Sequence, residues 1–363
     1  MKLHKINSNK IKKAIICKNV NSTIINKQIK KTYIPKAGDV AIFRVKEIGK
    51  HTRIQSVGGN NKFILSGDLI MAPFGNRYAT GQMEGYVPKS YHSTYHILGQ
   101  GGAIGVLRSI HDKFENIGPT TLSLVGYIVD ESGHVVNTKY LNNKPVLSSN
   151  SITNVRDPKV ILSLGTSMDS GKTTTAAFMA RGLKLAGKKI AYIKLTGTVF
   201  TKDKSMVRDY GAKISIDFSD FGFPSTYMCS TLELLNLYNR LIEQVMPHNP
   251  DYIIVEIADG LLQRETSALI HNKNFMRNIS GALFSSADSM SAISGSDLLT
   301  KLECTVIGVS GLFTTSPLLV QEVEQQSNYT VLTGKDLMSK EIINTLETKL
   351  NYSKFENKMA VNI

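Results

Sequence analysis

The chain has 363 residues, of which 42% are apolar and 20% charged, with a formal net charge of +14. This length suffices for two domains with cores of their own, and the composition is that of an ordinary soluble globular protein. The longest apolar stretches fall far short of the ~20 residues that cross a bilayer, and the N-terminal one is too short for a signal peptide. We therefore expect a cytoplasmic protein without a membrane span. Its three cysteines form no Cys-x-x-Cys pair and indicate neither disulfides nor zinc.

The positive charge is concentrated at the N-terminus. Residues 1–36 contain ten lysines and no acidic residue, so the 33 basic and 29 acidic residues of the remaining chain leave only +4. Such a segment can bind a phosphate backbone or an anionic surface, but it also fits a Lys/Asn/Ile-rich extension without a partner. We expect residues 1–34 to form a flexible basic leader, and we expect nucleic-acid binding only through it.

Short alternating segments separated by Gly- and Asn-rich turns follow between residues 35 and 145. The segments with a strand pattern are Val40–Val45, Thr52–Val57, Lys62–Leu65, Leu69–Met71, Leu122–Val129 and Val135–Thr138. This pattern predicts a small β-rich, barrel-like domain. The polar stretch 146–158, which contains a Ser-Ser-Asn-Ser run, is expected to be a linker.

From residue 159 to 363, apolar strand-like runs alternate with helix-length segments. The runs are Val160–Leu164, Ile190–Ile193, Tyr252–Val255, Gly281–Phe284 and Thr305–Val309, and the main helical segments are Thr173–Ala186, Thr231–Met246 and Ser296–Leu302. Unbroken apolar strands joined by helical crossovers imply an α/β domain with a mostly parallel sheet covered on both faces. Ligands of such domains bind at the carboxyl ends of the strands.

The segment after the first of these strands has the features of a phosphate-binding loop. It consists of Gly165, Thr166, Ser167, Met168, Asp169, Ser170, Gly171, Lys172, Thr173 and Thr174. In such a loop, successive N–H groups and the positive end of the following helix converge on phosphates. Lys172 neutralises charge, and the Thr173 hydroxyl ligates Mg²⁺. The sequence therefore predicts that the chain binds Mg²⁺ and a nucleoside triphosphate, ATP by default with GTP as the alternative.

The strict G-x-x-x-x-G-K-S/T pattern fails by one position, because the preceding glycine is Gly165. Gly165-Thr166, four further residues and Gly171-Lys172-Thr173 resemble the loop of dethiobiotin synthetase and related P-loop enzymes of the SIMIBI branch. Mg²⁺ prefers hard oxygen ligands, and Glu256 ends the apolar strand Tyr252–Val255. The resemblance, which covers the C-terminal domain only, implies that Glu256 and then Asp259 lie beside the metal. The repeated glycines of the family are missing after Glu256, so backbone contacts do not carry over.

The resemblance also implies a role for Lys194, which ends the second strand. The corresponding lysine of dethiobiotin synthetase-like enzymes faces the substrate and the transferred phosphoryl group, and Lys194 would neutralise charge there. Asp217 and Asp220 belong to an aromatic-rich segment and can bind metal, activate a nucleophile, or simply cap a buried turn. Arg264 can clamp a phosphate or carboxylate, or pair with an acid on the surface.

Two functions fit these residues. The first is a Mg²⁺-dependent enzyme that uses ATP to activate a small acidic substrate by phosphoryl transfer, as a ligase or kinase, with Lys172 and Lys194 stabilising the transferred group. The alternative is a nucleotide-switched regulator or assembly factor with NTPase activity. Dimerising ATPases of this branch carry an extra lysine where Ser167 stands here, and the chain has no Cys/His cluster for metal insertion. Both absences favour the enzyme. We further expect a homo-oligomer that binds no membrane.

Overall fold

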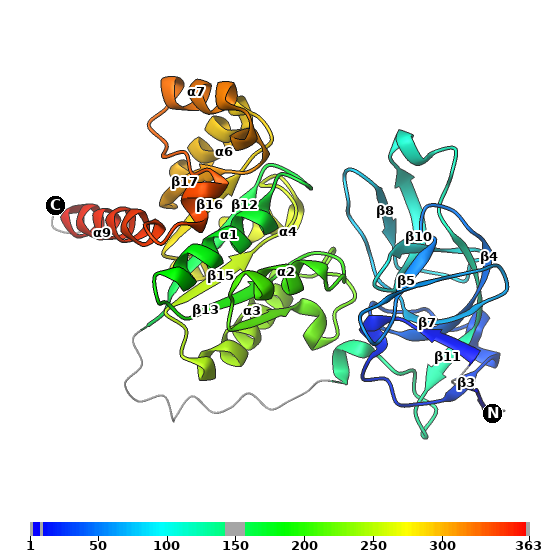
Figure 1. The fold of residues 1–363 in the computed structure, drawn as a ribbon. Helices are drawn as coiled ribbons and strands as arrows, with labels where there is room; N and C mark the ends of the chain where they lie inside the picture. The colour runs from blue at the N-terminus through cyan, green and yellow to red at the C-terminus, as the bar shows by residue number, and fades with distance from the viewer. Residues whose placement is uncertain (1–2, 8–9, 142–156, 361–363) are drawn as a thin grey trace. The chain divides into compact units, whose positions relative to one another are not determined.

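The computed structural model describes residues 3–7, 10–141 and 157–360 of the chain (Figure 1). These residues divide into two compact units. Unit 1 consists of Met1–Pro145, Gly197–Thr201 and Phe218–Met228, and unit 2 consists of Val146–Thr196, Lys202–Asp217 and Cys229–Ile363. The predicted linker falls almost wholly outside the described residues. No helix within the described ranges is long and apolar enough to cross a bilayer.

Unit 1 is built on a nine-stranded sheet in the order β2-β7-β4-β11-β9-β10-β8, with β3 beside β11 and β1 beside β3. Its strands are β1 (Leu3–Lys5), β2 (Ile11–Lys13), β3 (Ile24–Asn26), β4 (Val40–Glu47), β7 (Leu69–Pro73), β8 (Met83–Tyr86), β9 (Tyr95–Gly99), β10 (Ala103–Ile110) and β11 (Thr121–Val129). A separate hairpin pairs β5 (Arg53–Gln55) with β6 (Asn61–Phe63). Short 3-10 turns are η2 (Ile15–Cys17), η3 (Gln28–Lys31), η4 (Asp112–Phe114), η5 (Thr138–Tyr140) and η7 (Phe218–Phe221).

The large sheet of unit 1 curls on itself. An isolated bridge joins Phe74, just after β7, to Ile104 in β10, and the Gly75 amide donates to the Ile104 carbonyl at 2.8 Å. Inside the curl, the fully buried rings of Phe43, Phe74 and Tyr95 meet edge to face with centroids 5.3 to 5.9 Å apart. Such pairs stabilise a core beyond their buried area. The β-rich region expected from the alternating pattern is therefore present, in the form of a curled sheet.

The expectation of a flexible N-terminal leader is wrong for the residues that the structure describes. Strand β2 pairs with β7, β3 pairs with β11, and the Ala14 amide donates to the Met71 carbonyl at 3.0 Å. The physical reason lies in the apolar residues between the lysines. Residues 14–17 are at most 8% exposed, so burying them orders a segment whose charges stay at the surface.

Unit 2 contains a six-stranded sheet in which every strand pair is parallel, with the order β14-β13-β15-β12-β16-β17. Its strands are β12 (Lys159–Gly165), β13 (Ile190–Lys194), β14 (Ile214–Asp217), β15 (Tyr252–Glu256), β16 (Gly281–Ser285) and β17 (Val306–Ser310). The predicted parallel α/β sheet is thus confirmed. Strand β14 was not predicted, because Ile214 to Asp217 alternates apolar and polar residues over only four positions.

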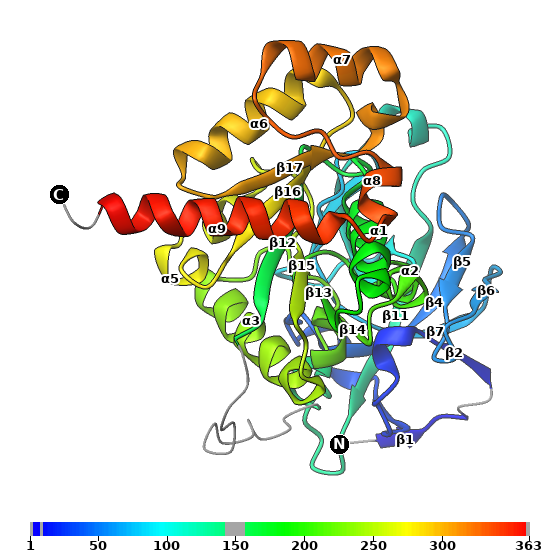
Figure 2. The same ribbon diagram turned by 60° about the vertical axis from the view of Figure 1, so that its left-hand side comes forward.

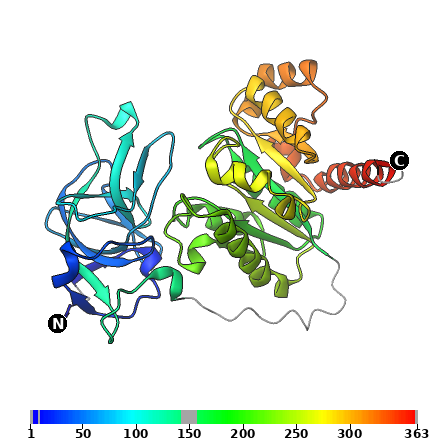
Figure 3. The ribbon, with the colours of Figure 1, turned by 180° about the vertical axis from the view of Figure 1, so that it is seen from behind.

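Helices cover both faces of this sheet. They are α1 (Lys172–Leu185), α2 (Lys202–Tyr210), α3 (Thr231–Val245), α4 (Arg264–Ile270), α5 (Lys273–Met276), α6 (Ser289–Lys301), α7 (Pro317–Gln326), α8 (Gly334–Met338) and α9 (Ile342–Ala360), with 3-10 turns η8 (Met246–His248) and η9 (Leu312–Thr315). A core cluster joins the sheet to α1, α2, α8 and α9 on one face (Figure 2). Helices α3 and α6 cover the other face (Figure 3). Helix α6 begins seven residues before the predicted Ser296.

Candidate functional site

The predicted phosphate loop connects the central strand β12 to α1. Strand β12 runs parallel to β15 and β16, with Ser163 opposite Glu256 and Gly165 opposite Ser285. The loop therefore leaves the sheet at the carboxyl ends of three neighbouring strands, the edge where parallel α/β sheets bind ligands. Gly171 immediately precedes α1 with φ of 100°, a conformation that favours glycine.

The start of α1 is left open by the protein itself. Its N-cap residue is Gly171, which has no side chain to accept a hydrogen bond from the first turn. The first N–H groups of any helix lack partners within the helix and carry a partial positive charge. By contrast, side chains cap α3, α4, α5, α6 and α8. An anion at the start of α1 would supply the missing acceptor.

Glycines from three segments pack tightly around the loop. A Cβ on Gly165 would lie 2.8 Å from the Lys172 Cγ atom, and one on Gly311 would lie 2.5 Å from the Ser170 carbonyl oxygen. A Cβ on Gly260 would overlap the Thr166 carbonyl oxygen. Real Cβ contacts do not become this short, so the loop conformation depends on all three glycines. The packing of Gly260 and Gly311 was missed from the sequence, where the only available signal is a glycine shortly after an apolar strand.

The Lys172 side chain folds back over the loop. It is 6% exposed, and its Nζ atom donates to the Ser167 carbonyl at 2.5 Å and lies 3.4 Å from the Ser170 Oγ atom. Burial lowers the pKa of Lys172, while Glu256 and Asp259 act in the opposite direction. An ammonium group has three donors, and burial from water strengthens its attraction for an anion.

Glu256, at the end of β15, is the centre of a buried polar cluster. Its carboxylate is 1% exposed and accepts hydrogen bonds from Thr173 Oγ1 at 3.0 Å and from the Tyr192 hydroxyl at 2.7 Å. Lys194 Nζ lies 3.0 Å from the same carboxylate. The sequence indicated Thr173, Lys194 and Glu256, and the structure brings them together. Tyr192 was missed because its position on an apolar strand gives no polar signal.

The Thr173 hydroxyl and Glu256 carboxylate fit a Mg²⁺ ion. Both are hard oxygen donors, and Mg²⁺ is typically held by one or two such protein groups while phosphate and water fill its remaining positions. No group of three or more His, Cys, Asp or Glu side chains among the described residues is arranged to hold a metal. Thr173 and Glu256 therefore suit a metal ion whose remaining ligands come from a nucleotide and water.

Lys194 is held by two acids. Burial alone would lower the pKa of Lys194, but Glu256 and Asp203 outweigh burial and raise it, so the side chain stays cationic. The Asp203 contact comes from α2 and is short. The Glu256 and Asp203 carboxylates are both paired with Lys194, so neither is a negative charge without a cation beside it.

The other predicted site residues lie in different surroundings. Asp217, at the end of β14, is 2% exposed and pairs with Lys204 at 3.1 Å. Asp220 lies in η7, belongs to unit 1, and pairs with Lys18 at 2.8 Å. The aromatic-rich segment that contains both acids is therefore divided between the two units.

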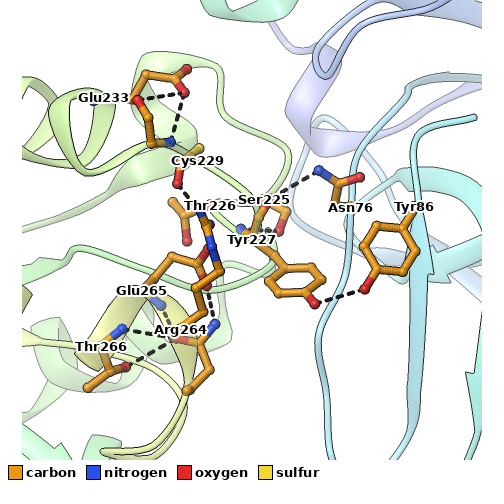
Figure 4. Close-up of polar contacts among 12 residues, drawn as sticks. Asn76, Tyr86, Ser225, Thr226, Tyr227, Cys229, Glu233, Arg264, Glu265 and Thr266 are labelled. Atoms are coloured by element: carbon orange, nitrogen blue, oxygen red, sulfur yellow. Dashed lines mark hydrogen bonds and ion pairs between the residues drawn. The ribbon is translucent and has the colours of Figure 1, made fainter. Parts of the chain in front are cut away.

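Arg264 is the first residue of α4. Its guanidinium donates to the Cys229 carbonyl at 3.0 Å and to the Glu265 carboxylate (Figure 4). Arg264 therefore pairs with an acid, as one of the two alternatives held, but that acid is buried rather than on the surface, since Glu265 is 1% exposed. Asp259, in the segment between β15 and α4, is close enough to Lys172 to act on its pKa.

Asp288, after β16, is the N-cap residue of α6. Its side chain caps α6 by accepting a hydrogen bond from the Ser291 amide at 2.8 Å, and it accepts a second from the Ser291 hydroxyl at 2.6 Å. These hydrogen bonds lower the pKa of Asp288.

No protein-family model matches the chain, and no curated protein matches it by sequence. Among solved structures, the signal recognition particle receptor FtsY from Elizabethkingia anophelis is 18% identical, with a TM-score of 0.36 over 56% of this chain and 69% of that one.

Two further solved structures illustrate the range. The signal recognition particle 54 kDa protein from Aeropyrum pernix, in complex with GDP, is 15% identical, with a TM-score of 0.37 over 57% of this chain and 51% of that one. A nucleotide-binding protein from Archaeoglobus fulgidus, in complex with ADP, is 11% identical, with a TM-score of 0.32 over 53% and 86%. Because these TM-scores lie below 0.5, we base the function on the residues of this chain. The resemblance to dethiobiotin synthetase stays a prediction.

Proposed function

We propose that the chain is a nucleotide-switched NTPase that binds a Mg²⁺-nucleoside triphosphate at residues 165–174 and hydrolyses its terminal phosphate. One observation carries the proposal. The Lys172 amine, the Thr173 hydroxyl and the Glu256 carboxylate lie together at the uncapped start of α1, with Thr173 Oγ1 3.0 Å from Glu256. A buried cation, a helix N-terminus and a pair of hard oxygen donors are the groups that a triphosphate and its metal require.

Each residue of this cluster has a role that follows from its surroundings. Lys172 and the N–H groups of the loop bind phosphate oxygens, and Thr173 with Glu256 would hold Mg²⁺. Tyr192 and Lys194 orient the Glu256 carboxylate through their contacts of 2.7 and 3.0 Å. When bound, Mg²⁺ supplies positive charge that stabilises the phosphate oxygens as the terminal bond breaks.

The segments next to these residues connect the site to unit 1. The Ala258 carbonyl, two residues after Glu256, accepts hydrogen bonds from Thr196 Oγ1 at 2.8 Å and from Thr266 Oγ1 at 2.9 Å. Thr196 is followed directly by Gly197–Thr201, which belongs to unit 1. A shift of the Glu256 segment would therefore act on the start of a unit 1 segment through Thr196.

The second unit 1 segment, Phe218–Met228, is bound on both of its sides. Gly197 donates to Thr226 Oγ1 at 2.9 Å, and the Thr226 amide donates to the Gly197 carbonyl at 3.0 Å. The Asn76 side chain donates to the Tyr227 carbonyl at 3.1 Å, and the Tyr227 hydroxyl lies 3.0 Å from that of Tyr86 (Figure 4). These contacts support a switch in which segments that follow β13 and β14 carry the nucleotide state to unit 1.

Phosphoryl transfer to an acidic substrate is supported less well. Three groups beyond the phosphate loop that such a reaction would use are engaged by other side chains: Lys194 by Glu256 and Asp203, Asp217 by Lys204, and Arg264 by Glu265. Hydrolysis requires only water as the acceptor of the phosphoryl group. We therefore place hydrolysis first and treat transfer as the alternative that the experiment must separate from it.

Phosphate release from Mg²⁺-ATP and Mg²⁺-GTP tests the reaction. The purified chain is incubated with each nucleotide, alone and with a panel of dicarboxylic and amino acids. We expect slow release that the panel does not change and that EDTA abolishes. Formation of the nucleoside diphosphate that depends on the presence of one acid would instead establish the transferase. Absence of both activities, together with absence of nucleotide binding, would refute both functions.

Hydrogen exchange tests the switch. We expect the amides of residues 218–228 to exchange at different rates with a non-hydrolysable triphosphate and with the diphosphate. Tyr227→Phe, which removes a hydroxyl contact without touching the loop, should reduce this difference and leave the hydrolysis rate unchanged. Identical exchange in both nucleotide states would contradict the switch while leaving hydrolysis intact.

A further inference from the structure

The net charge of the protein belongs almost entirely to one unit. Unit 1 contains 21 basic and 9 acidic residues, a net charge of +12, whereas unit 2 contains 22 basic and 20 acidic residues, a net charge of +2. A lysine-rich composition imposed on the whole chain would raise the charge of both units. Most of this asymmetry comes from residues 1–36, which contain ten lysines and no acidic residue, whereas the rest of unit 1 contains 11 basic and 9 acidic residues. A positively charged surface outside that segment must therefore be located from the contacts of individual side chains.

Exposed cations of unit 1 gather around the segment that connects β6 to β7. Lys12 Nζ donates to the Phe63 carbonyl at 2.9 Å, and the Arg44 guanidinium donates to the Gly67 carbonyl at 3.1 Å. The Ser66 hydroxyl donates to the Lys46 backbone carbonyl at 2.7 Å, which places the backbone of this exposed lysine beside the same segment. Arg53 is paired with Phe63 across the β5–β6 hairpin. We call these side chains the hairpin patch: Lys12, Arg44, Lys46, Arg53, Lys62 and Phe63.

Two acids belong to the same segments. Asp68 is paired with Lys12, and Glu47 follows Lys46 at the end of β4. With five cations against these two acids, the patch and its borders keep a net positive charge. Arg44 and Lys46 are exposed on β4, and Arg53 and Lys62 are exposed on the hairpin.

An aromatic ring lies among these cations. Phe63 is 59% exposed, and the guanidinium of Arg53 lies 4.0 Å from its ring centroid. Leu65, two residues later, is 65% exposed. A guanidinium stacked on a phenyl ring forms a flat, positively charged platform. Proteins that bind single-stranded nucleic acid combine such platforms, on which bases stack, with cations that follow the phosphate backbone.

We propose that unit 1 binds single-stranded nucleic acid through the hairpin patch. Arg44 and Lys46 contact phosphates, and a base stacks on Phe63 beside Arg53. Lys62, which projects from the other face of the β5–β6 hairpin, adds positive charge at its edge. Stacking on a side chain requires an unpaired base, so a duplex offers the patch its phosphates only. A lipid surface also attracts cations, but it gives no role to the stacked pair of Phe63 and Arg53.

Fluorescence anisotropy of labelled oligonucleotides tests the proposal on the full chain. The probes are oligo-dT and oligo-rU of about 12 nucleotides, a length within the range of known single-strand sites, and a duplex of equal length. We expect tighter binding of a single strand than of the duplex, with an affinity that falls as salt rises because counterions are released. The comparison of dT with rU identifies the sugar that the patch prefers.

Two variants and a matched control locate the site. The triple variant R44Q/R53Q/K62Q should weaken single-strand binding at least 10-fold and reduce its salt dependence. F63A should weaken it by roughly 5- to 100-fold, as loss of one stacked base does, whereas F63Y should bind nearly as well as the original chain. The control K273Q/R277Q/K301Q removes three exposed cations from unit 2 and should bind like the original chain.

Several results would overturn the proposal. These are no single-strand binding at about 100 μM protein in low salt, a range that includes ordinary non-specific affinities, or equal or tighter binding of the duplex. Equal losses in the patch and control triple variants would show charge without a site. Binding to phosphatidylserine vesicles with no binding to oligonucleotide would assign the surface to a membrane instead.

Discussion

Helices α1 and α6 begin at the same edge of one sheet, after the adjacent strands β12 and β16, yet their first turns are filled differently. Gly165 and Ser285 are register partners near the ends of these strands. At α6, the Asp288 carboxylate accepts from the Ser291 amide at 2.8 Å, so the helix supplies its own anion. At α1, Gly171 has no side chain, and the Lys172 cation lies beside the first turn.

This difference separates a structural helix start from a binding one. Both helices have a partial positive charge at the N-terminus. Helix α6 uses this charge for stability, because Asp288 is part of the fold. At α1, the positive charge of Lys172 adds to the partial charge of the helix N-terminus, and no side chain caps that N-terminus, so both charges can bind an anionic ligand. The chain thus keeps one of two adjacent helix starts available for a phosphate.

The largest expected effect is on nucleotide affinity. Lys172→Ala removes the cation beside α1, and we expect nucleotide binding to weaken by roughly 10- to 100-fold, because hydrogen bonds to charged groups contribute ~1.5–3 kcal/mol. Isothermal titration calorimetry measures this effect. Lys184→Ala, near the other end of the same helix, should leave the affinity unchanged. Equal losses in the two variants would contradict a site at the start of α1.

The next effect concerns the metal. Thr173→Ala removes one of the two oxygen donors proposed for Mg²⁺, and we expect the affinity for the Mg²⁺ nucleotide to fall about 10-fold, toward the affinity measured in EDTA. Thr173 is preferable to Glu256 for this test, since removing Glu256 would also take away one of the two acidic partners of the buried Lys194. If the variant keeps its full dependence on Mg²⁺, the metal is not bound at Thr173.

A smaller effect distinguishes the capped helix. Asp288→Ala removes the cap of α6, and we expect the free energy of unfolding to fall by about 1 kcal/mol without a change in nucleotide affinity. Ser230→Ala, which removes the cap of α3, is the matched variant and should behave alike. Urea denaturation measures both. Loss of nucleotide binding in the Asp288 variant would mean that α6, not α1, begins at the ligand.

The smallest effect is a pH dependence of stability. Burial lowers the pKa of Lys172 below 10.5, so between the folded and unfolded pKa values the unfolded chain binds more protons. The free energy of unfolding without ligand should therefore rise with pH in that window, and Lys172→Met should rise less. Denaturation midpoints at several pH values test this sign. A steeper rise in the variant would show that Lys172 is not destabilised by burial.

Much of unit 2 could be predicted because its signals are local. The apolar runs of β12, β13, β15, β16 and β17 need no partner to be recognised, and α1 and α3 were placed within about a residue of their bounds. The loop was predicted for the same reason. Glu256 was expected beside the metal because it ends an apolar strand and matches the acidic segment of dethiobiotin synthetase-like proteins, and it lies 3.0 Å from Thr173 Oγ1.

What the sequence did not reveal depends on contacts between distant segments. Gly311 shapes the loop from the far end of β17, and Asp203 reaches Lys194 from α2. Residues 14–17 order the lysine-rich N-terminus only because the curled sheet of unit 1 offers them a core. Nothing local in these residues specifies the partner, so their roles appear only when the fold is assembled.

Hydrogen exchange at the two helix starts tests the central claim most directly. Amide exchange is measured with and without a saturating Mg²⁺ nucleotide, for residues 167–174 at α1 and residues 289–292 at α6. We predict slower exchange at 167–174 on binding and no change at 289–292. Protection confined to the start of α6, or no protection at 167–174 while nucleotide is bound, would contradict the assignment of α1 as the phosphate site.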